Sequence, residues 1–296
     1  MNLKYHILWI ENEKDWVESV EDQIQDYLED LGFLYEKMLV AKEEKNINYS
    51  DFDLILMDLN LADQPNGAEL ISKIRDLGVY TDVVFYSASG IEELRAKGRD
   101  KELEGVFYSG RTPETAFVNR VKAVIYATLK KVQDLNNLRG LVMAEVSELD
   151  AMMDGIILSH FNTVEMMELF HKHVTSNREK SLRKSLSCSN NCKLSWRCDC
   201  IQEIVPQLDS SQKARALKII LEQTTPELYK EKNFYEEYVE AIINPRNELA
   251  HCKSKIHNGV EVLVTKNGDK YFDDIFFKDI RKNILKYSSL FIDLME

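Results

Sequence analysis

The sequence predicts a two-domain protein in which an α/β domain is followed by an all-α domain. Its 296 residues are enough for about two domains of ordinary size. Up to about residue 135, short apolar runs alternate with amphipathic segments, which is typical of a doubly wound parallel sheet. Beyond that point helical spacing of apolar residues dominates. We therefore predict a doubly wound domain with five parallel strands over residues 1–135, and a helical bundle with a small β-hairpin over residues 136–296.

In the first half, five short runs rich in apolar residues predict the strands of the sheet. These runs are KYHILWI (4–10), FLYEKMLVA (33–41), FDLILMDL (52–59), DVVFYSA (82–88) and EGVFYS (104–109). Segments with helical spacing follow, and glycine or proline marks several of their ends. The expected helices cover residues 11–32, closed by Gly32, 66–78, closed by Gly78, 91–103, and 113–132, opened by Pro113.

In the second half, apolar residues at helical spacing predict five helices and one hairpin. The expected helices cover residues 138–161, 162–186, 209–223, 233–243 and 273–295. Alternating apolar and polar residues flank Asn267-Gly268, and Asn-Gly between such runs is a strong hairpin signal. We therefore expect a hairpin near residues 260–272.

Charge and hydropathy argue against nucleic-acid binding by the first half and against a membrane protein. The net charge is −12, and residues 1–135 carry 26 acidic against 16 basic side chains. Because phosphates need cations, the N-terminal half is a poor candidate for binding nucleic acid, whereas the remainder is near neutral. No apolar run reaches the length of a membrane span, and the first residues lack the features of a secretory signal. We expect a cytoplasmic protein without membrane contact.

Polar residues collect where the predicted strands end. The first strand is followed by Glu11 and Asn12, the third ends at Asp58, and the fourth ends at Ser87. The carboxyl ends of parallel strands meet at one edge of a sheet, where α/β proteins bind their ligands. Carboxylates that converge there suit a hard cation such as Mg²⁺.

This layout resembles the receiver domain of bacterial response regulators, most specifically in the segment LILMDLNLADQPNGAELISKIR. The resemblance implies that Asp58 is the phosphoacceptor and that a histidine kinase or another regulator acts on it. It also implies that Glu11, Asn12 and Asp58, together with the Asn60 carbonyl, hold Mg²⁺. Ser87 then corresponds to the switch hydroxyl that contacts the phosphoryl group.

Two departures from the receiver pattern leave two interpretations open. The acidic pair is Glu-Asn instead of two aspartates, and the family's lysine after the fifth strand has no counterpart. Counting from Ser87 places that lysine at Ser109, and Arg111 is the candidate substitute. Arginine is not equivalent to lysine as a point cation. The domain is therefore either competent for phosphorylation or a degenerate receiver that serves dimerisation or protein binding.

The stretch NPRNELAHCK, residues 244–253, contains a second set of candidate residues. Asn247 and His251 are four apart and share a helix face, and the long Arg246 side chain can reach the same region. A neutral imidazole can take the proton from a ribose 2′-hydroxyl. A guanidinium can hold a phosphate and offset charge in the transition state. Arg246, Asn247 and His251 are thus candidate catalytic residues for RNA cleavage.

The R-x4-H pattern on a late helix is similar to that of the HEPN superfamily of all-helical domains. The resemblance implies a metal-independent endoribonuclease of the toxin or anti-phage type, in which two motifs meet across a homodimer. We expect a receiver-like domain that regulates such a nuclease. The alternative is a non-catalytic response regulator whose helical domain binds a protein or nucleotide, with Arg246 and His251 in structural roles.

Four of the five cysteines lie close together in a polar segment. Cys188, Cys192, Cys198 and Cys200 have the spacing C-x3-C-x5-C-x-C. Four thiolates suit tetrahedral Zn²⁺, but zinc modules usually carry paired C-x2-C turns. A zinc site and a set of ordinary or redox-sensitive thiols both remain open.

Overall fold

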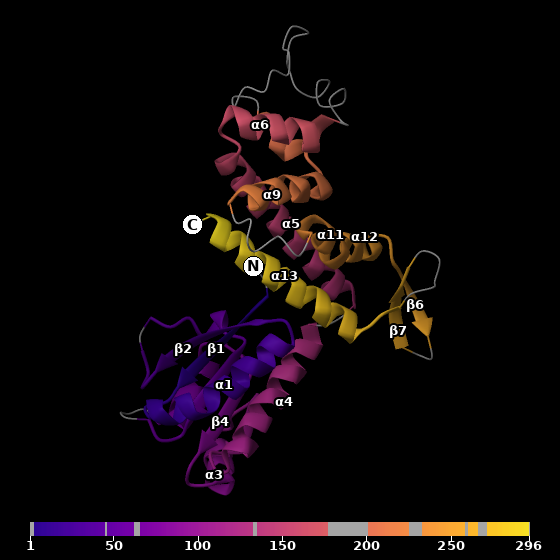
Figure 1. Ribbon diagram of the computed structural model, residues 1–296. Helices are drawn as coiled ribbons and strands as arrows, with labels where there is room; N and C mark the ends of the chain where they lie inside the picture. Colours follow the sequence, from indigo (N-terminus) through magenta and orange to yellow (C-terminus); the bar gives the residue numbers. More distant parts are fainter. Residues whose placement is uncertain are drawn as a thin grey trace. The chain divides into compact units, whose positions relative to one another are not determined.

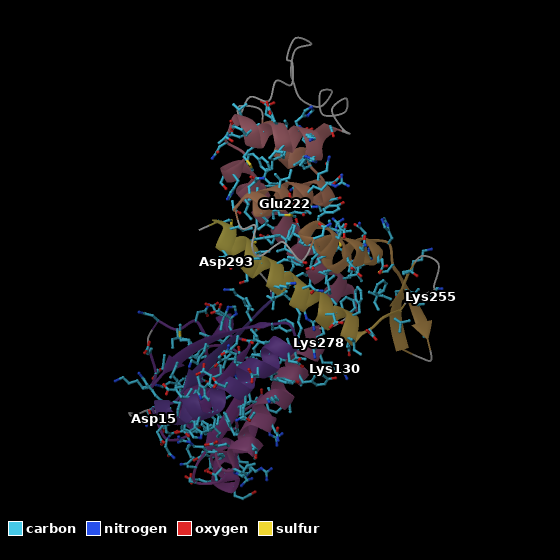
Figure 2. All side chains as sticks on the ribbon, viewed as in Figure 1. Asp15, Lys130, Glu222, Lys255, Lys278 and Asp293 are labelled. Atoms are coloured by element: carbon cyan, nitrogen blue, oxygen red, sulfur yellow. The ribbon has the colours of Figure 1, made fainter. Side chains whose placement is uncertain are left out.

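The computed structural model describes residues 3–44, 46–61, 66–132, 135–176, 201–224, 233–257, 260–265 and 271–295 (Figure 1). The chain divides into two compact units between Leu138 and Arg139, close to the boundary expected after residue 135. We call them the N-terminal domain and the helical domain. Exposed charged residues such as Asp15, Lys255 and Asp293 lie on the surfaces of the two domains (Figure 2).

The N-terminal domain is built on one five-stranded sheet in which every neighbouring pair of strands is parallel. The strands are β1 (Lys4–Ile10), β2 (Leu34–Val40), β3 (Leu54–Asp58), β4 (Val83–Ser87) and β5 (Val106–Gly110). Their order, β2-β1-β3-β4-β5, confirms the predicted doubly wound sheet. In this order the chain changes direction across the sheet between β1 and β3, which is where such folds place their ligands.

In the described part of this domain, four α-helices and one 3₁₀-helix accompany the sheet. They are α1 (Lys14–Asp30), η1 (Tyr49–Asp51), α2 (Gly67–Asp76), α3 (Ile91–Asp100) and α4 (Glu114–Val132). Every residue of β3 and β4 is buried, as expected for central parallel strands covered on both faces. Aromatic rings join α1, β4 and α4: the Phe117 ring lies 4.9 Å from Trp16 and 4.7 Å from Tyr86. This packing supports the strand ends from one side.

Helix α2 begins in direct contact with the end of β3. The Asn66 side chain accepts a hydrogen bond from the Glu69 N–H and caps the helix. A Cβ atom on Gly67 would lie 2.0 Å from the Asp58 carbonyl oxygen, so only glycine fits at this position. The close approach packs the first turn of α2 against the backbone of Asp58.

Within the described residues, the helical domain is built from the α-, π- and 3₁₀-helices that follow α4, the first of which begins just before the domain boundary. They are α5 (Leu135–His160), α6 (Val164–Phe170), η2 (His171–Thr175), α8 (Ile201–Ile204), η5 (Val205–Gln207), α9 (Ser210–Thr224), α11 (Phe234–Tyr238), η6 (Val239–Ile243), α12 (Asn244–Ala250) and α13 (Asp274–Met295). Rings of α11 and α13 pack together in its core, with Tyr238 and Tyr287 centroids 4.9 Å apart. None of the helices in the described ranges combines the length and apolar character needed to span a bilayer.

A small antiparallel sheet follows α12 and has one strand more than the predicted hairpin. Strands β7 (Val260–Val264) and β8 (Tyr271–Phe272) pair as expected, while the Asn267-Gly268 turn lies outside the described residues. The extra strand is β6 (Lys253–His257), which pairs with β7. Its sequence carries little apolar signal, and Ile256 is 80% exposed, so burial does not reveal this strand in the pattern.

Candidate functional site

Four polar side chains from successive strand ends are buried at one edge of the N-terminal sheet. They follow or end β1, β3, β4 and β5, and they are Glu11, Asp58, Ser87 and Arg111. Each is less than 10% exposed. Charged residues are seldom buried unless they are paired or functional, so this edge is the candidate site of the domain.

Of the two carboxylate oxygens of Asp58, one accepts a hydrogen bond and the other does not, within the described part of the chain. Its Oδ2 accepts a hydrogen bond of 2.8 Å from the Asn60 N–H. Its Oδ1 is buried and accepts no hydrogen bond within the described part of the chain. Burial and the neighbouring Glu11 charge raise the pKa of Asp58 to about 6, against the opposing effects of the Asn60 N–H and Arg111. A buried carboxylate oxygen without a hydrogen-bond partner calls for an explanation, and a site for a cation or for a reacting group is one.

Glu11 is held in place by groups of its own domain. Its Oε1 accepts the Glu13 N–H at 2.9 Å, and its Oε2 accepts the Tyr86 hydroxyl at 3.1 Å. That hydroxyl in turn accepts a hydrogen bond from Trp9 Nε1 at 2.8 Å. The chain of bonds ties the Glu11 carboxylate to the aromatic core and fixes its position near Asp58.

Arg111 brings a fixed positive charge to the same edge. Its two terminal nitrogens donate to the Glu13 carboxylate at 2.9 and 2.8 Å, and its guanidinium carbon lies 4.2 Å from the Trp16 ring centroid. Nη1 is also 3.9 Å from Glu11 Oε2. Burial acts to lower the pKa of Arg111, but the Glu13 hydrogen bonds and the nearby carboxylates, including Asp58, raise it overall. The arginine therefore remains charged.

Ser109 does not contribute a charge to the site. It is the position at which counting from Ser87 places the receiver lysine. Its side chain is buried and donates to the Gly110 carbonyl oxygen at 3.0 Å. Arg111, the expected substitute, is the residue whose charge reaches Asp58 and Glu11. Glu13, which follows Glu11 and Asn12 in the sequence but has no predicted role, holds this arginine in place as the N-cap residue of α1.

The Ser87 hydroxyl belongs to a pair. Its Oγ lies 2.7 Å from Ser89 Oγ and accepts the Ser89 N–H at 3.1 Å. Asp58 and Tyr86 are partners in the β3–β4 register, so Ser87 lies one residue beyond the partner of Asp58. The Arg111 N–H donates to the Ser87 carbonyl at 3.0 Å and ties β4 to the arginine.

The donor set at this edge suits a hard divalent cation. Asp58 and Glu11 offer carboxylate oxygens, one of them without a partner, and Mg²⁺ in proteins is commonly held by one or two carboxylates with water filling other positions. Asn12 is exposed, and the described residues include no cluster of three His, Cys, Asp or Glu side chains with metal-binding geometry. Cys188, Cys192, Cys198 and Cys200 lie outside the described residues.

In the helical domain, the R-x4-H residues lie at the end of a helical run. The π-turn η6 directly precedes α12. Pro245, in the first turn of α12, has no N–H to donate to the preceding turn, and the helical hydrogen-bond pattern is interrupted there. Arg246 Nη1 donates to Asn247 Oδ1 at 3.1 Å. His251 is the C-cap residue of α12 and is exposed. Arg246 and Asn247 are thus in contact, and His251 follows the helix instead of lying within it.

A partly buried carboxylate, that of Asp150, interacts electrostatically with Arg246. Asp150 of α5 accepts the Ser210 hydroxyl at 2.6 Å. Burial raises the pKa of Asp150, while Ser210, Lys213 and Arg246 act to lower it. Lys213 is itself buried and lies 2.7 Å from Asp154 Oδ1. Asp150 and Asp154 are four residues apart on one helix face, which is the signal in the sequence that could have identified them.

Comparison with known proteins finds similar structures for the N-terminal part of the chain. No protein-family model and no curated protein sequence matches the chain. Solved structures do match. The phosphorylated cyanobacterial phytochrome response regulator RcpA is 22% identical over 43% of this chain and 96% of its own, with a TM-score of 0.35. The receiver domain of Francisella response regulator 1452 is 14% identical over 42% of this chain and 98% of its own, with a TM-score of 0.34.

The N-terminal domain has a receiver-like fold. Its strand order, β2-β1-β3-β4-β5, and its parallel pairings establish that fold. A third match, the receiver domain of HemR from Leptospira biflexa, is 22% identical over 41% of this chain and 94% of its own, with a TM-score of 0.33. A shared fold leaves function to be argued from the residues of the site.

Proposed function

We propose that the receiver-like domain is a phosphorylation switch in which Asp58 accepts a phosphoryl group. The observation that carries the proposal is the Asp58 carboxylate itself. It is buried at the strand ends beside Glu11 and Arg111, and its Oδ1 has no hydrogen-bond partner among the described residues. Each of these features favours a carboxylate that gains a cation or a covalent substituent.

The transfer step is a substitution at phosphorus. An Asp58 oxygen attacks the phosphorus of a phosphohistidine or an acyl phosphate, and the bond from phosphorus to the leaving nitrogen or oxygen breaks with its electron pair. The product is an aspartyl phosphate. Arg111 provides a fixed positive charge near the new phosphoryl oxygens, and the Ser87 hydroxyl can donate to one of them. Mg²⁺ held by Asp58 and Glu11 would supply further positive charge.

Intact-mass measurement after incubation with acetyl phosphate and Mg²⁺ tests this step. We expect the full chain to gain one phosphoryl group, and Asp58→Asn to gain none. Asp76→Asn, at an exposed aspartate at the end of α2, is the matched control and should behave as the unchanged protein. No gain in the unchanged protein, or an equal gain in Asp58→Asn, would contradict the proposal.

We further propose that the helical domain is the output of this switch and cleaves RNA as a homodimer, in the manner of a toxin or an anti-phage nuclease. Support comes from the exposed His251 at the end of α12 and from Arg246 in the first turn of the same helix.

The proposed cleavage needs no metal. The His251 imidazole takes the proton of a ribose 2′-hydroxyl, and the 2′-oxygen attacks the adjacent phosphorus. The bond from phosphorus to the 5′-oxygen breaks, and that oxygen receives a proton from His251 of the partner subunit. The products are a 2′,3′-cyclic phosphate and a 5′-hydroxyl end. Arg246 binds the scissile phosphate, and Asn247 orients Arg246 through the contact between their side chains.

A second candidate function is a non-catalytic response regulator whose helical domain binds a protein or a nucleotide. Cleavage of a labelled RNA pool in the presence of EDTA separates the two. On the nuclease proposal, His251→Ala lowers the rate by about 100-fold or more. His160→Ala should leave the rate unchanged, because the His160 ring nitrogen Nδ1 lies 2.9 Å from Ser159 Oγ and from the Ile156 carbonyl oxygen of its own helix, away from the R-x4-H residues in the sequence. Equal rates for the unchanged protein and His251→Ala would favour the binding function.

A further inference from the structure

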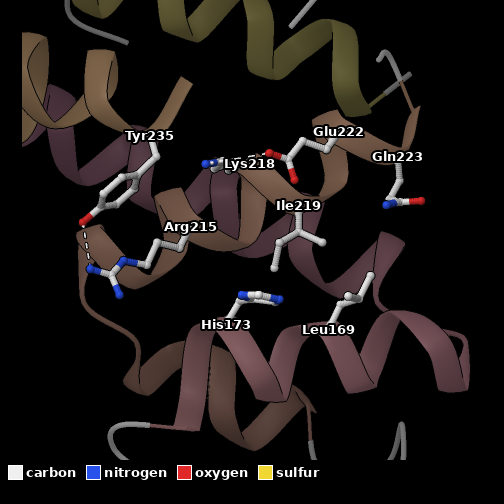
Figure 3. A pocket seen from close by; sticks show the side chains of 8 residues that line it. All are labelled: Leu169, His173, Arg215, Lys218, Ile219, Glu222, Gln223 and Tyr235. Carbon is white, nitrogen blue, oxygen red and sulfur yellow. Dashed lines mark hydrogen bonds and ion pairs between the residues drawn. The ribbon is translucent and has the colours of Figure 1, made fainter. Parts of the chain in front are cut away.

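A pocket in the helical domain lies between α9 and the segment formed by α6 and η2, with Tyr235 of α11 at one side (Figure 3). Its volume is about 350 Å³. This falls at the lower end of the range of small-molecule sites in proteins, which begins near 300 Å³. The pocket involves neither the strand-end site of the N-terminal domain nor the R-x4-H residues of α12, so an inference about it depends neither on phosphorylation of Asp58 nor on RNA cleavage. A nucleotide bound here would give the second candidate function its ligand and its site.

Positive charge gathers on one wall of the pocket. Arg215 and Lys218 are three residues apart on α9, so they share a face of that helix. Lys218 shares its charge with Glu222, whose carboxylate is 3.8 Å away. Within the part of the chain that the structure describes, no carboxylate lies within ion-pair distance of Arg215. Counting these three groups, the pocket is formally positive in a protein whose net charge is −12.

Arg215 is oriented by Tyr235. Its Nη2 donates to the Tyr235 hydroxyl at 3.2 Å, and its guanidinium carbon lies 5.0 Å from the centroid of that ring. The hydroxyl is also 2.8 Å from Ser211 Oγ. Burial acts to raise the pKa of Tyr235, but the bonds to Ser211 and Arg215 hold it below its ordinary value. Because Tyr235 contacts the Arg215 guanidinium from one side, the other N–H groups of the guanidinium can donate to an anion.

The opposite part of the pocket is apolar with a polar edge. Ile219 points from α9 toward His173 and Leu169 of the facing segment (Figure 3). The imidazole, the leucine and the isoleucine form a surface against which a flat ring can pack. Gln223, the next lining residue of α9 beyond Glu222, offers both an amide donor and a carbonyl acceptor.

We propose that this pocket binds a nucleoside monophosphate. A phosphate monoester carries close to two negative charges at neutral pH, which matches two cations on one helix face better than a single carboxylate does. Arg215 binds the phosphate through two parallel hydrogen bonds, and Lys218 contributes a second cation. The base packs against Leu169 and Ile219, and its polar edge meets the Gln223 amide.

Isothermal titration of the full chain with AMP, GMP, CMP and UMP tests the proposal, with the matching nucleosides and inorganic phosphate as partial ligands. We expect at least one nucleotide to bind with a dissociation constant below about 1 mM. Its nucleoside and inorganic phosphate should each bind at least about tenfold more weakly, because each lacks one half of the contacts.

Substitutions locate the binding in this pocket. Arg215→Gln and Lys218→Gln should each weaken binding by about tenfold or more, since each removes a charged contact to phosphate. Lys172→Gln is the matched control, because Lys172 is exposed on η2 next to His173 but does not line the pocket, and its affinity should be unchanged. No binding by any nucleotide, or equal binding by the unchanged protein and both glutamine variants, would overturn the proposal. A nucleoside that binds as tightly as its monophosphate would do the same.

Discussion

The strand ends of the N-terminal domain and the end of α12 both carry candidate chemical groups, but the two regions hold them differently. At the strand ends, Glu11, Asp58 and Arg111 are buried, and each makes a hydrogen bond inside its own domain. At the end of α12, His251 is exposed and Arg246 contacts Asn247, the next residue in the chain. The first region is organised within one chain, whereas on the nuclease proposal the second is completed by groups from RNA or from another subunit.

The difference follows from the geometry of the two folds. The strands of a parallel sheet end at one edge and bring residues far apart in the sequence together there, as with Glu13 after β1 and Arg111 after β5, which are 98 positions apart. A helix end presents side chains from one short segment only. A catalytic arrangement on such an end is completed by groups from elsewhere, which is why the nuclease proposal includes a dimer.

Removal of a buried cation in the helical domain should have the largest effect. Lys213 lies 2.7 Å from Asp154 Oδ1 and donates to the Asp150 carbonyl oxygen. Lys213→Met leaves these groups without their cation and should lower the stability of the helical domain by roughly 3 kcal/mol. Thermal unfolding followed by circular dichroism checks this, with the exposed Lys172→Met as control. Equal melting of both variants would show that the buried charges of this domain are less tightly coupled than we describe.

The pH dependence of stability should reveal the buried charge of Asp58. Its folded pKa of about 6 lies above the ordinary value of 3.8, so its favourable contribution is complete below about pH 4 and is lost as the pH rises through 6. A shift of about two units corresponds to about 3 kcal/mol. Above pH 7, Asp58→Asn should therefore be more stable than the unchanged protein by roughly 2–3 kcal/mol.

Urea unfolding between pH 4 and pH 8, followed by tryptophan fluorescence, to which Trp9 and Trp16 of the N-terminal domain contribute, measures this difference. The gap between the two proteins should open as the pH rises and then level off, and the exposed control Asp76→Asn should show no such gap. A gap that is constant with pH would mean that the charge of Asp58 is already compensated.

A matched pair of glycine substitutions tests how closely α2 approaches β3. Gly67→Ala places a Cβ atom 2.0 Å from the Asp58 carbonyl oxygen and should destabilise the N-terminal domain by roughly 1–3 kcal/mol. At Gly140 of α5 a Cβ meets no atom within 4 Å, so Gly140→Ala should be neutral or stabilise its helix by up to about 1 kcal/mol. Tryptophan fluorescence and circular dichroism in urea report the two effects, and a Gly67→Ala variant of unchanged stability would disprove the close contact.

The sequence predicted the sheet because its central strands are buried on both faces. The continuous apolar runs of β3 and β4 indicate buried parallel strands. Because such strands end at the same edge of the sheet, the sequence also predicts that Glu11, Asp58 and Ser87 lie together. It did not predict the contact between Glu13 and Arg111, because a polar residue in a loop carries no signal for a distant partner. It also did not predict β6, which is paired through its backbone while Ile256 remains exposed.

The central claim is that the strand-end site controls the helical domain, and hydrogen–deuterium exchange of the full chain tests it most directly. The unchanged protein and Asp58→Asn are each compared before and after treatment with acetyl phosphate and Mg²⁺. We predict that treatment alters the exchange of amides in the helical domain, including α12, in the unchanged protein and not in Asp58→Asn. Changes confined to residues before Leu138, or equal changes in both proteins, would contradict the account.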